Sequence, residues 1–518
     1  MENQTTEQKL VMCMDTLLHS VDNRYVQAYS ISMVPCELKI SPNDDAYIPR
    51  VVSMGPRYKN SREELMHLEE IKLRCMLSLL HRTGKGEADA NLMKCCNTIC
   101  GLNEEIRASY VDDIHLQEQE LAKIMVVDGC FLLELLITKG FDSELPSHLY
   151  PPTTAALQVL QNDDVLSDLV LLENQIPISI VHALSKTLFP QFFKEDFKQR
   201  ANKINSLALR ILGYSLPQVQ SLDINSPHLL DVVHSFVNNN NNNNNHHNDH
   251  YAVVLDIDLD DTQTQPVNVM EFKLKHCASR LQAAGVNIQL TRQDSRNISC
   301  FGWIRNFFGG VLIWLGNMIV KNKKVDMLAK GGVRGLNFEF KFENGKLQIA
   351  PLHITKTTKA KWRNMIAWEH HKMDWKKTSS NNGRNQINMI SSGSSTCSKF
   401  ASAALIFNDL ICCADDVKLL KNKNIIVGHM KMSNKELEEC MRTVSSGVDH
   451  GVVGSGYFKM VDDLNNYSKV VFPIRIWKTL CHLFTYYLEW FTKFMKRDYN
   501  FVAAVLAILT VHYKKLDL

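Results

Sequence analysis

The spacing of apolar residues between positions 163 and 184 predicts a buried helix that ends abruptly. Asp163 and Asp164 are typical N-terminal caps, and Pro177 removes the amide that would continue the helix. The polar triplet Glu173–Gln175 is expected to hydrogen-bond locally and to fix the turn. We interpret the segment as a structural pivot, with a catalytic Glu173 as the alternative. The apolar positions at helical spacing are Val165, Leu166, Leu169, Val170 and Leu172.

Two further helices are indicated by capping boxes, in which a Ser and a Glu three positions later satisfy the first amides of a helix. Ser61 with Glu64 predicts a helix that runs to about His81. Ser433 with Glu436 predicts another near the C-terminal end.

The segment 121–139 is apolar on nearly every side, which is typical of a central core helix. The pair Asp128-Gly129 is expected to interrupt it. Further helices are predicted over residues 103–114, 400–420 and 477–495.

One segment shows the alternation of a β-hairpin. Phe338, Phe340 and Phe342 alternate with polar residues, and Asn344-Gly345 supplies a tight turn before the alternation returns through residues 347–349. The predicted fold class is therefore mainly α with minor α+β character, a multi-helix globular body with a small hairpin at about 336–352.

Composition divides the chain into four parts. Residues 1–237 form a helical N-terminal lobe, and residues 238–250 begin with eight asparagines and read as a disordered linker. Residues 251–496 form a C-terminal lobe that contains the hairpin, and residues 497–518 form a short apolar C-terminal segment.

The apolar run at 501–511 is the candidate membrane helix, although it is shorter than the roughly 20 residues that a span requires. The N-terminus lacks the basic region and apolar core of a secretory signal. The 14 cysteines are spread thinly, so we expect reduced thiols. On its own the run at 501–511 is too short to predict a span.

Charge and motifs exclude several classes of function. Lys plus Arg number 58 against 55 Asp plus Glu, so no basic field for nucleic acid exists. No phosphate-binding loop or nucleophile elbow is present. The cysteines at 95, 96 and 100 lack the spacing of a zinc site, and the histidines at 246, 247 and 250 lie in the linker. We therefore predict no catalytic, cofactor or metal site, and no small-molecule substrate.

Several motifs follow one another in a familiar order. They include YIPRVVSMGPRY at 47–58, VDGCFLLELL at 127–136, DLVLLENQIPISIV at 168–181, WRNMIAWEHH at 362–371 and FNDLICCADDVKLLKNKNII at 407–426. In this order the chain resembles the plant domain of unknown function 247 family over nearly its whole length. The signature residues, to which we assign a structural role, are Pro49, Gly55, Pro56, Glu69, Lys72, Asp128, Gly129, Leu172, Glu173, Asn174, Gln175, Ile176, Pro177, Arg363, Asn364, Asp415, Asp416 and Val417.

The resemblance implies a mostly helical protein with a C-terminal transmembrane helix and no assigned biochemical activity. Carried onto residues 501–511, it implies a single-pass membrane protein with its bulk in the cytosol, or a soluble cytoplasmic protein if the short anchor fails. Some relatives in grasses are implicated in pollen and stigma self-recognition. Residues 296–335 depart from the family pattern and represent either an insertion or translated noncoding sequence.

Two hypotheses of function follow. The first is a membrane-associated recognition or signalling component that contacts an unidentified protein partner. The alternative is an enzyme of unrecognised class that uses Asp128, Glu173 or His370 as an acid or base. A soluble degenerate copy of the family is a third interpretation.

Overall fold

A computed structural model describes most of the chain. The described residues are 30–41, 44–82, 86–112, 114–140, 154–190, 196–214, 224–239, 273–291, 338–381, 398–428, 432–450, 457–469 and 499–516, with a few isolated positions elsewhere. The linker from residue 240 onward, the departure at 296–335 and most of the helix predicted at 477–495 lie outside this part.

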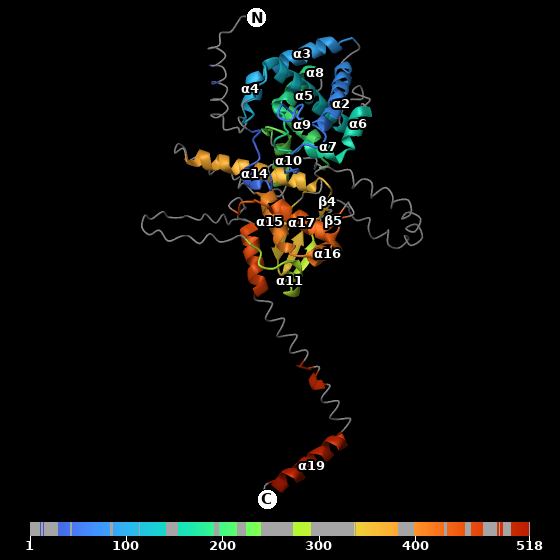
Figure 1. The fold of residues 1–518 in the computed structure, drawn as a ribbon, viewed down its shortest axis with the longest axis vertical. Coiled ribbons are helices and arrows are strands. Elements are labelled where there is room, and N and C mark those ends of the chain that lie inside the picture. The colour runs from blue at the N-terminus through green and yellow to red at the C-terminus, as the bar shows by residue number, and fades with distance from the viewer. Residues whose placement is uncertain are drawn as a thin grey trace, which may run out of the picture.

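Helices dominate the first part of the fold, and α5 lies at its centre (Figure 1). Apolar residues surround α5 on most sides, so it packs against α2, α3, α8 and α9 at once. The central core helix predicted for 121–139 is therefore confirmed. The elements are η1 (Cys36–Leu38), α2 (Glu63–His81), α3 (Ala88–Cys100), α4 (Asn103–Ala108), α5 (Glu118–Gly140), α6 (Thr154–Leu160), α7 (Asp163–Asp168), α8 (Ile178–Leu188), α9 (Phe197–Ile211) and α10 (Leu229–Asn239).

Two small sheets and further helices form the second part. Strands run β1-β3-β2 in one sheet, where β3 pairs parallel to β1 and antiparallel to β2, while β4 and β5 pair in parallel. The elements are α11 (Ala278–Ala283), β1 (Asn287–Leu290), β2 (Phe340–Glu343), β3 (Lys346–Ile349), β4 (Leu352–Ile354), α14 (Thr358–Asn381), α15 (Lys399–Leu410), α16 (Ala414–Asn422), β5 (Ile426–Gly428), α17 (Asn434–Ser445) and α19 (Tyr499–Leu516). The mainly helical fold class is confirmed.

The predicted hairpin is confirmed as β2 and β3. Asn344 and Gly345 both have positive φ, 50° and 75°, as a type I′ turn requires. Phe342 pairs with Leu347 across the turn. Phe338, just before β2, is buried with its ring centroid 4.4 Å from that of Trp362 on α14.

The long helix predicted from Asp163 is wrong beyond its first turns. α7 ends at Asp168, and its N-cap is Asn162, whose side chain accepts the amide of Asp164. Residues 169–177 are buried but not helical. The reason is that the side-chain amides of Asn174 and Gln175 bind the carbonyls of residues 168, 169 and 171, which a continuing helix would use for its own amides.

Two other boundary predictions are also wrong. α2 begins after Arg62 with no side-chain cap, because the Ser61 hydroxyl donates to the carbonyl of Tyr58 instead. The helix predicted over 400–420 is two helices, α15 and α16, separated by a turn at Cys412 and Cys413. By contrast, the capping box of Ser433 and Glu436 is confirmed in both of its hydrogen bonds.

Gly129 does not interrupt α5. A side chain at Gly129 would lie 2.6 Å from Cδ1 of Leu184 and 2.7 Å from Cγ2 of Ile180, so glycine allows α8 to pack closely on α5. The expected interruption at Asp128-Gly129 is therefore wrong, and the helix runs continuously through it.

Helix α19 covers the predicted C-terminal segment and lies away from the helical body (Figure 1). Its described apolar side chains are exposed, with Ile508 at 64% and Val511 at 63%. Among the described helices, none has both the length and the apolar character needed to cross a bilayer. The expected C-terminal membrane helix is thus not supported.

Candidate functional site

Signature residues from distant parts of the sequence meet around the extended segment 30–58. A buried ion pair lies at the centre of this network, between Lys72 on α2 and Asp128 on α5. The Lys72 ammonium lies 2.7 Å from Asp128 Oδ1 and 2.8 Å from Glu69 Oε1, and both side chains of the Lys72–Asp128 pair are fully buried. Although burial opposes its charge, the carboxylates of Asp128 and Glu69 raise the pKa of Lys72. Lys72 therefore remains an ammonium group inside the core.

Gly55 joins the extended segment to this ion pair. Its amide donates to Asp128 Oδ2 at 2.8 Å, and its φ of 75° lies in the left-handed region. A side chain at this position would lie 2.7 Å from the Tyr110 hydroxyl and 2.8 Å from the carbonyl of Gln175. Both conformation and space therefore require glycine here.

Asn174 connects the loop 169–177 to the same segment, and Gln175 connects it to α10. Asn174 accepts the amide of Met54 at 2.7 Å and donates to the carbonyl of Val52 at 3.0 Å. Gln175 accepts the amide of Leu230 at the start of α10. The local bonding predicted for the triplet is present, but each side chain also holds a distant segment. Their amides are fully used, so they stabilise the fold.

Arg363 and Asn364 on α14 hold the same segments from the other side. Asn364 accepts the amide of Leu172 at 2.9 Å and donates to the carbonyl of Ala46 at 2.8 Å. The Arg363 guanidinium donates to the carbonyl of Leu38 and lies over the Tyr47 ring. α14 therefore fixes segments on either side of the predicted linker into one buried cluster.

Glu173 is a signature residue that also lines a cavity. Its carboxylate accepts the amide of Val34 at 2.9 Å and the hydroxyl of Tyr58 at 2.8 Å, and it lies near Lys39 and Arg57. Although burial opposes ionisation, these donors and charges lower the pKa of Glu173. The carboxylate therefore remains ionised.

The cavity in front of Glu173, here called the Glu173 cleft, has a volume of about 520 Å³. Its wall carries charges of both signs. The lining residues are Lys39, Asp44, Tyr47, Ile48, Arg57, Tyr58, Ser61, Asp112 and Glu173.

The residues of the enzyme hypothesis do not form a common site. Asp128 is bound by Lys72 and Gly55, whereas Glu173 is bound by Val34 and Tyr58. His370 lies on α14, a half-buried position beside Glu369. Glu369 itself accepts two amides from the start of α15. Asp128 and Glu173 thus lie in separate polar contacts.

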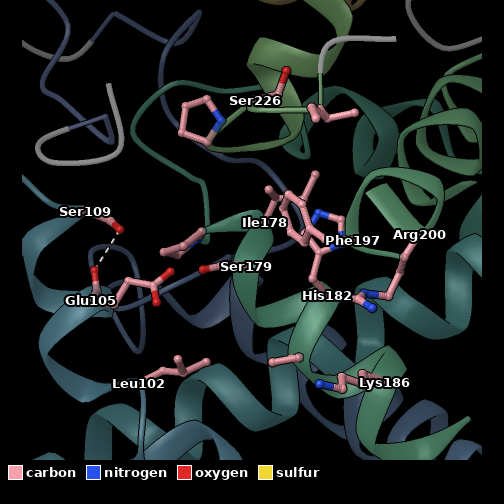
Figure 2. Close-up of a pocket in the computed structure, with 14 residues that line it drawn as sticks. Leu102, Glu105, Ser109, Ile178, Ser179, His182, Lys186, Phe197, Arg200 and Ser226 are labelled. Atoms are coloured by element: carbon pink, nitrogen blue, oxygen red, sulfur yellow. Dashed lines mark hydrogen bonds between the residues drawn. The ribbon is translucent and has the colours of Figure 1, made fainter. Parts of the chain in front are cut away.

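A second cavity, the His182 pocket, was not predicted from the sequence. It has a volume of about 330 Å³ and lies between α4, α8, α9 and the segment before α10 (Figure 2). His182 and Arg200 both lie beside Phe197, whose ring centroid is 5.6 Å from that of His182 and 5.7 Å from Arg200 Cζ (Figure 2). Burial and the Arg200 charge lower the pKa of His182 to about 4, so the ring is neutral at pH 7. A single histidine within the apolar α8 sequence was the available signal.

The last three signature residues, Asp415–Val417, lie apart from this network at the start of α16. Asp416 is buried and accepts the amides of Ser279 and Cys412. Val417 is fully buried. This group fixes the turn between α15 and α16 against α11.

Comparison with known proteins agrees with the signature. The chain is 23% identical over 439 residues to the Arabidopsis thaliana protein named UPF0481 protein At3g47200, a match that covers 83% of this chain and 75% of the relative. It is 29% identical over 159 residues to Putative UPF0481 protein At3g02645 of the same plant, covering 31% of this chain and 27% of that relative. No solved structure matches the chain.

The family itself is shown by a profile match. The DUF247 profile, described as a plant protein of unknown function, matches residues 31–313 and 314–511 and so covers most of the chain. The chain therefore belongs to the DUF247 family of plant proteins of unknown function.

Proposed function

We propose that this protein is a recognition component that contacts a protein partner through helix α19. The observation that supports this proposal is the exposure of apolar side chains on α19. Leu506 and Leu509 are each 58% exposed, and no described element packs extensively against the helix. An apolar helix face that remains in water is unfavourable, and burying each such side chain contributes about 1.5–3 kcal/mol.

The buried polar network favours recognition over catalysis by its own groups. Lys72, Asp128 and Asn174 are fully buried, and their polar atoms bind other protein groups. Such a network stabilises the body of the fold, and α19 is the element that we assign to partner contact. The partner would supply an apolar groove that buries the apolar side chains of α19 at positions i, i+3 and i+4.

Site-specific photocrosslinking of the full-length protein in plant cells tests the proposal. A photoreactive amino acid replaces Leu506 or Leu509, and the matched control replaces Met93, an exposed apolar residue on α3 of the helical body. We expect a protein adduct of one defined mass at Leu506 and Leu509 but not at Met93. A synthetic peptide of residues 499–516 should compete with this adduct, and an additional V505D/I508D substitution should abolish it.

Membrane attachment, which the family resemblance implies, is the competing outcome. Flotation of the same protein with phospholipid vesicles measures it. Adducts to lipid alone, together with flotation that V505D/I508D abolishes, would assign α19 to a membrane and contradict the proposal. The absence of both adduct and flotation would contradict it as well.

A further inference from the structure

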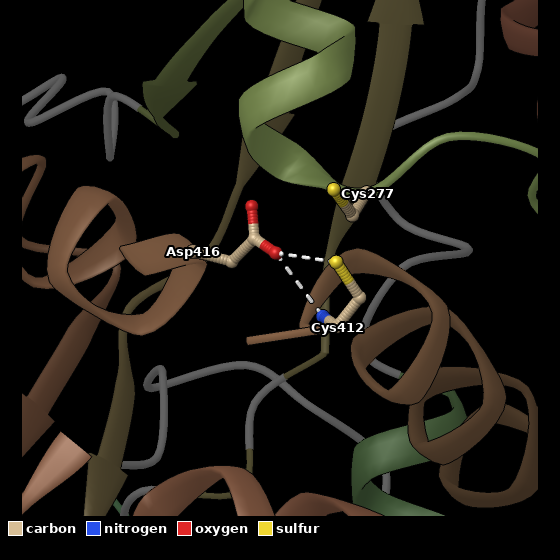
Figure 3. Close-up of side chains that lie close together, drawn as sticks. All are labelled: Cys277, Cys412 and Asp416. Carbon is tan, nitrogen blue, oxygen red and sulfur yellow. Dashed lines mark hydrogen bonds between the residues drawn. The ribbon is translucent and has the colours of Figure 1, made fainter. Parts of the chain in front are cut away.

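Three residues with metal-binding side chains meet at the start of α16, apart from the network around segment 30–58 and from both cavities; one of them, Asp416, is a signature residue. Cys277 is the N-cap of α11, Cys412 lies in the turn between α15 and α16, and Asp416 lies in the first turn of α16. Their two sulfur atoms and one carboxylate oxygen all lie within 4.8 Å of one another. Figure 3 shows both sulfurs on the same side of the Asp416 carboxylate.

The spacing of these atoms suits a small divalent cation. A zinc ion binds sulfur at about 2.3 Å and carboxylate oxygen at about 2.0–2.2 Å, so two sulfurs on one tetrahedral ion lie about 3.8 Å apart. The Cys412 sulfur already lies 3.1 Å from Asp416 Oδ2. The three ligand atoms therefore need to move by less than about 1 Å, through side-chain rotation, to surround one ion.

The surrounding backbone holds the carboxylate in place as a ligand. Asp416 Oδ1 accepts the Ser279 amide at 2.7 Å, which fixes the orientation of the carboxylate in the manner of an outer-shell contact.

We propose that Cys277, Cys412 and Asp416 form a zinc-binding site that joins α11 to the turn between α15 and α16. Binding replaces the two thiol protons, which pass to solvent, with two Zn–S bonds and one Zn–O bond. Cys412 is exposed, so the ion has a route of entry. The fourth position is open to water or to Cys413, whose sulfur lies 3.5 Å from Asp416 Oδ2.

Zinc titration of the reduced full-length protein against a chromophoric chelator tests the site. We expect one tight equivalent of Zn²⁺ and the release of about two protons per ion. C412S should weaken this binding by more than the roughly 10–100-fold that loss of an outer-shell contact costs. Cys412 is exposed, so this variant keeps the fold, and C277S tests the buried ligand.

C36S is the matched control, because Cys36 is an exposed cysteine in η1, outside the cluster. It should keep the tight equivalent. Cobalt titration provides a second readout, in which wild type and C36S show thiolate-to-cobalt absorption and C277S and C412S do not. Equal zinc affinity in wild type and C412S would overturn the proposal. Isolation of a Cys277–Cys412 disulfide from protein kept with zinc in reducing buffer would also overturn it, because the pair would then be a redox site.

Discussion

Replacing Lys72 with Met should destabilise the fold strongly, because it removes the cation from a buried carboxylate. Met keeps the apolar length of the side chain and deletes only the ammonium group. Asp128 then retains the Gly55 amide as a donor but loses its 2.7 Å partner at a site with no solvent exposure. Removal of one member of such a buried pair costs about 3–5 kcal/mol in the free energy of unfolding.

The same magnitude follows from the protonation of Asp128. A fully buried carboxylate without a counter-ion has its pKa raised by up to about 3–5 units. Folding the variant with Asp128 protonated at pH 7 then costs about 4 kcal/mol, because the pKa of an aspartate in the unfolded chain lies about three units below neutrality. The folded variant binds a proton more tightly than the unfolded chain, so its stability falls as pH rises and its deficit against wild type is smallest in acid.

Urea denaturation followed by circular dichroism, with hydrogen exchange of α5 peptides, measures this loss at pH 7 and pH 5. K94M is the control, because Lys94 is an exposed lysine on the neighbouring α3. The double variant K72M/D128N should lose less than the sum of the single variants, with a coupling of about 1–3 kcal/mol. A loss below about 1 kcal/mol for K72M, or strict additivity in the double variant, would refute the role given to the ion pair.

Three further perturbations test the remaining structure. G55A should lower the thermal midpoint well beyond G86A, since Gly55 and Gly86 both have positive φ but only Gly55 is enclosed, and equal shifts would contradict the close approach. Burial and Arg200 lower the pKa of His182 to about 4, so between pH 6.5 and 4 the unfolded chain binds a proton that the folded chain does not. The free energy of unfolding therefore falls by up to roughly 3 kcal/mol as pH falls through this range. H182Q should remove that acid-dependent loss in denaturation experiments, and the exposed-site control H67Q should retain it. E173Q should cost about 1–3 kcal/mol in urea denaturation, because the donors of Val34 and Tyr58 use different carboxylate oxygens and the amide offers only one acceptor oxygen. An unchanged midpoint would contradict this.

Patterns that depend on neighbours in the chain were predictable from the sequence. Asn344-Gly345 requires two positive φ values that few other pairs adopt, so it specified its own turn. Ser433 and Glu436 satisfy each other within four residues. The apolar residues on nearly every side of α5 predict a buried helix whichever elements surround it. Each of these predictions was correct because its physical cause lies within one element.

The predictions that were wrong depended on partners far away in sequence. Leu169–Leu172 has helical spacing, yet the Gln175 side chain donates to the carbonyls of Leu169 and Leu171. Asn364, 192 positions from Leu172, accepts the Leu172 amide. The Lys72–Asp128 pair spans 56 positions, and no periodicity shows which lysine meets which aspartate. The Cys277–Cys412 cluster spans 135 positions and was missed for the same reason.

The distribution of the signature residues separates fold from function in this chain. Gly55, Lys72 and Asp128 lie with Asn174 and Asn364 in buried contacts that fix the segment 30–58 against α2, α5 and α14. A substitution among them changes whether the chain folds, so loss of activity in such a variant would not identify a functional group. Functional variants are better placed on α19, in the His182 pocket and at the cysteine cluster, because these positions can be altered while the buried network stays intact. A variant there that keeps the wild-type unfolding midpoint but loses partner or zinc binding would separate the two effects.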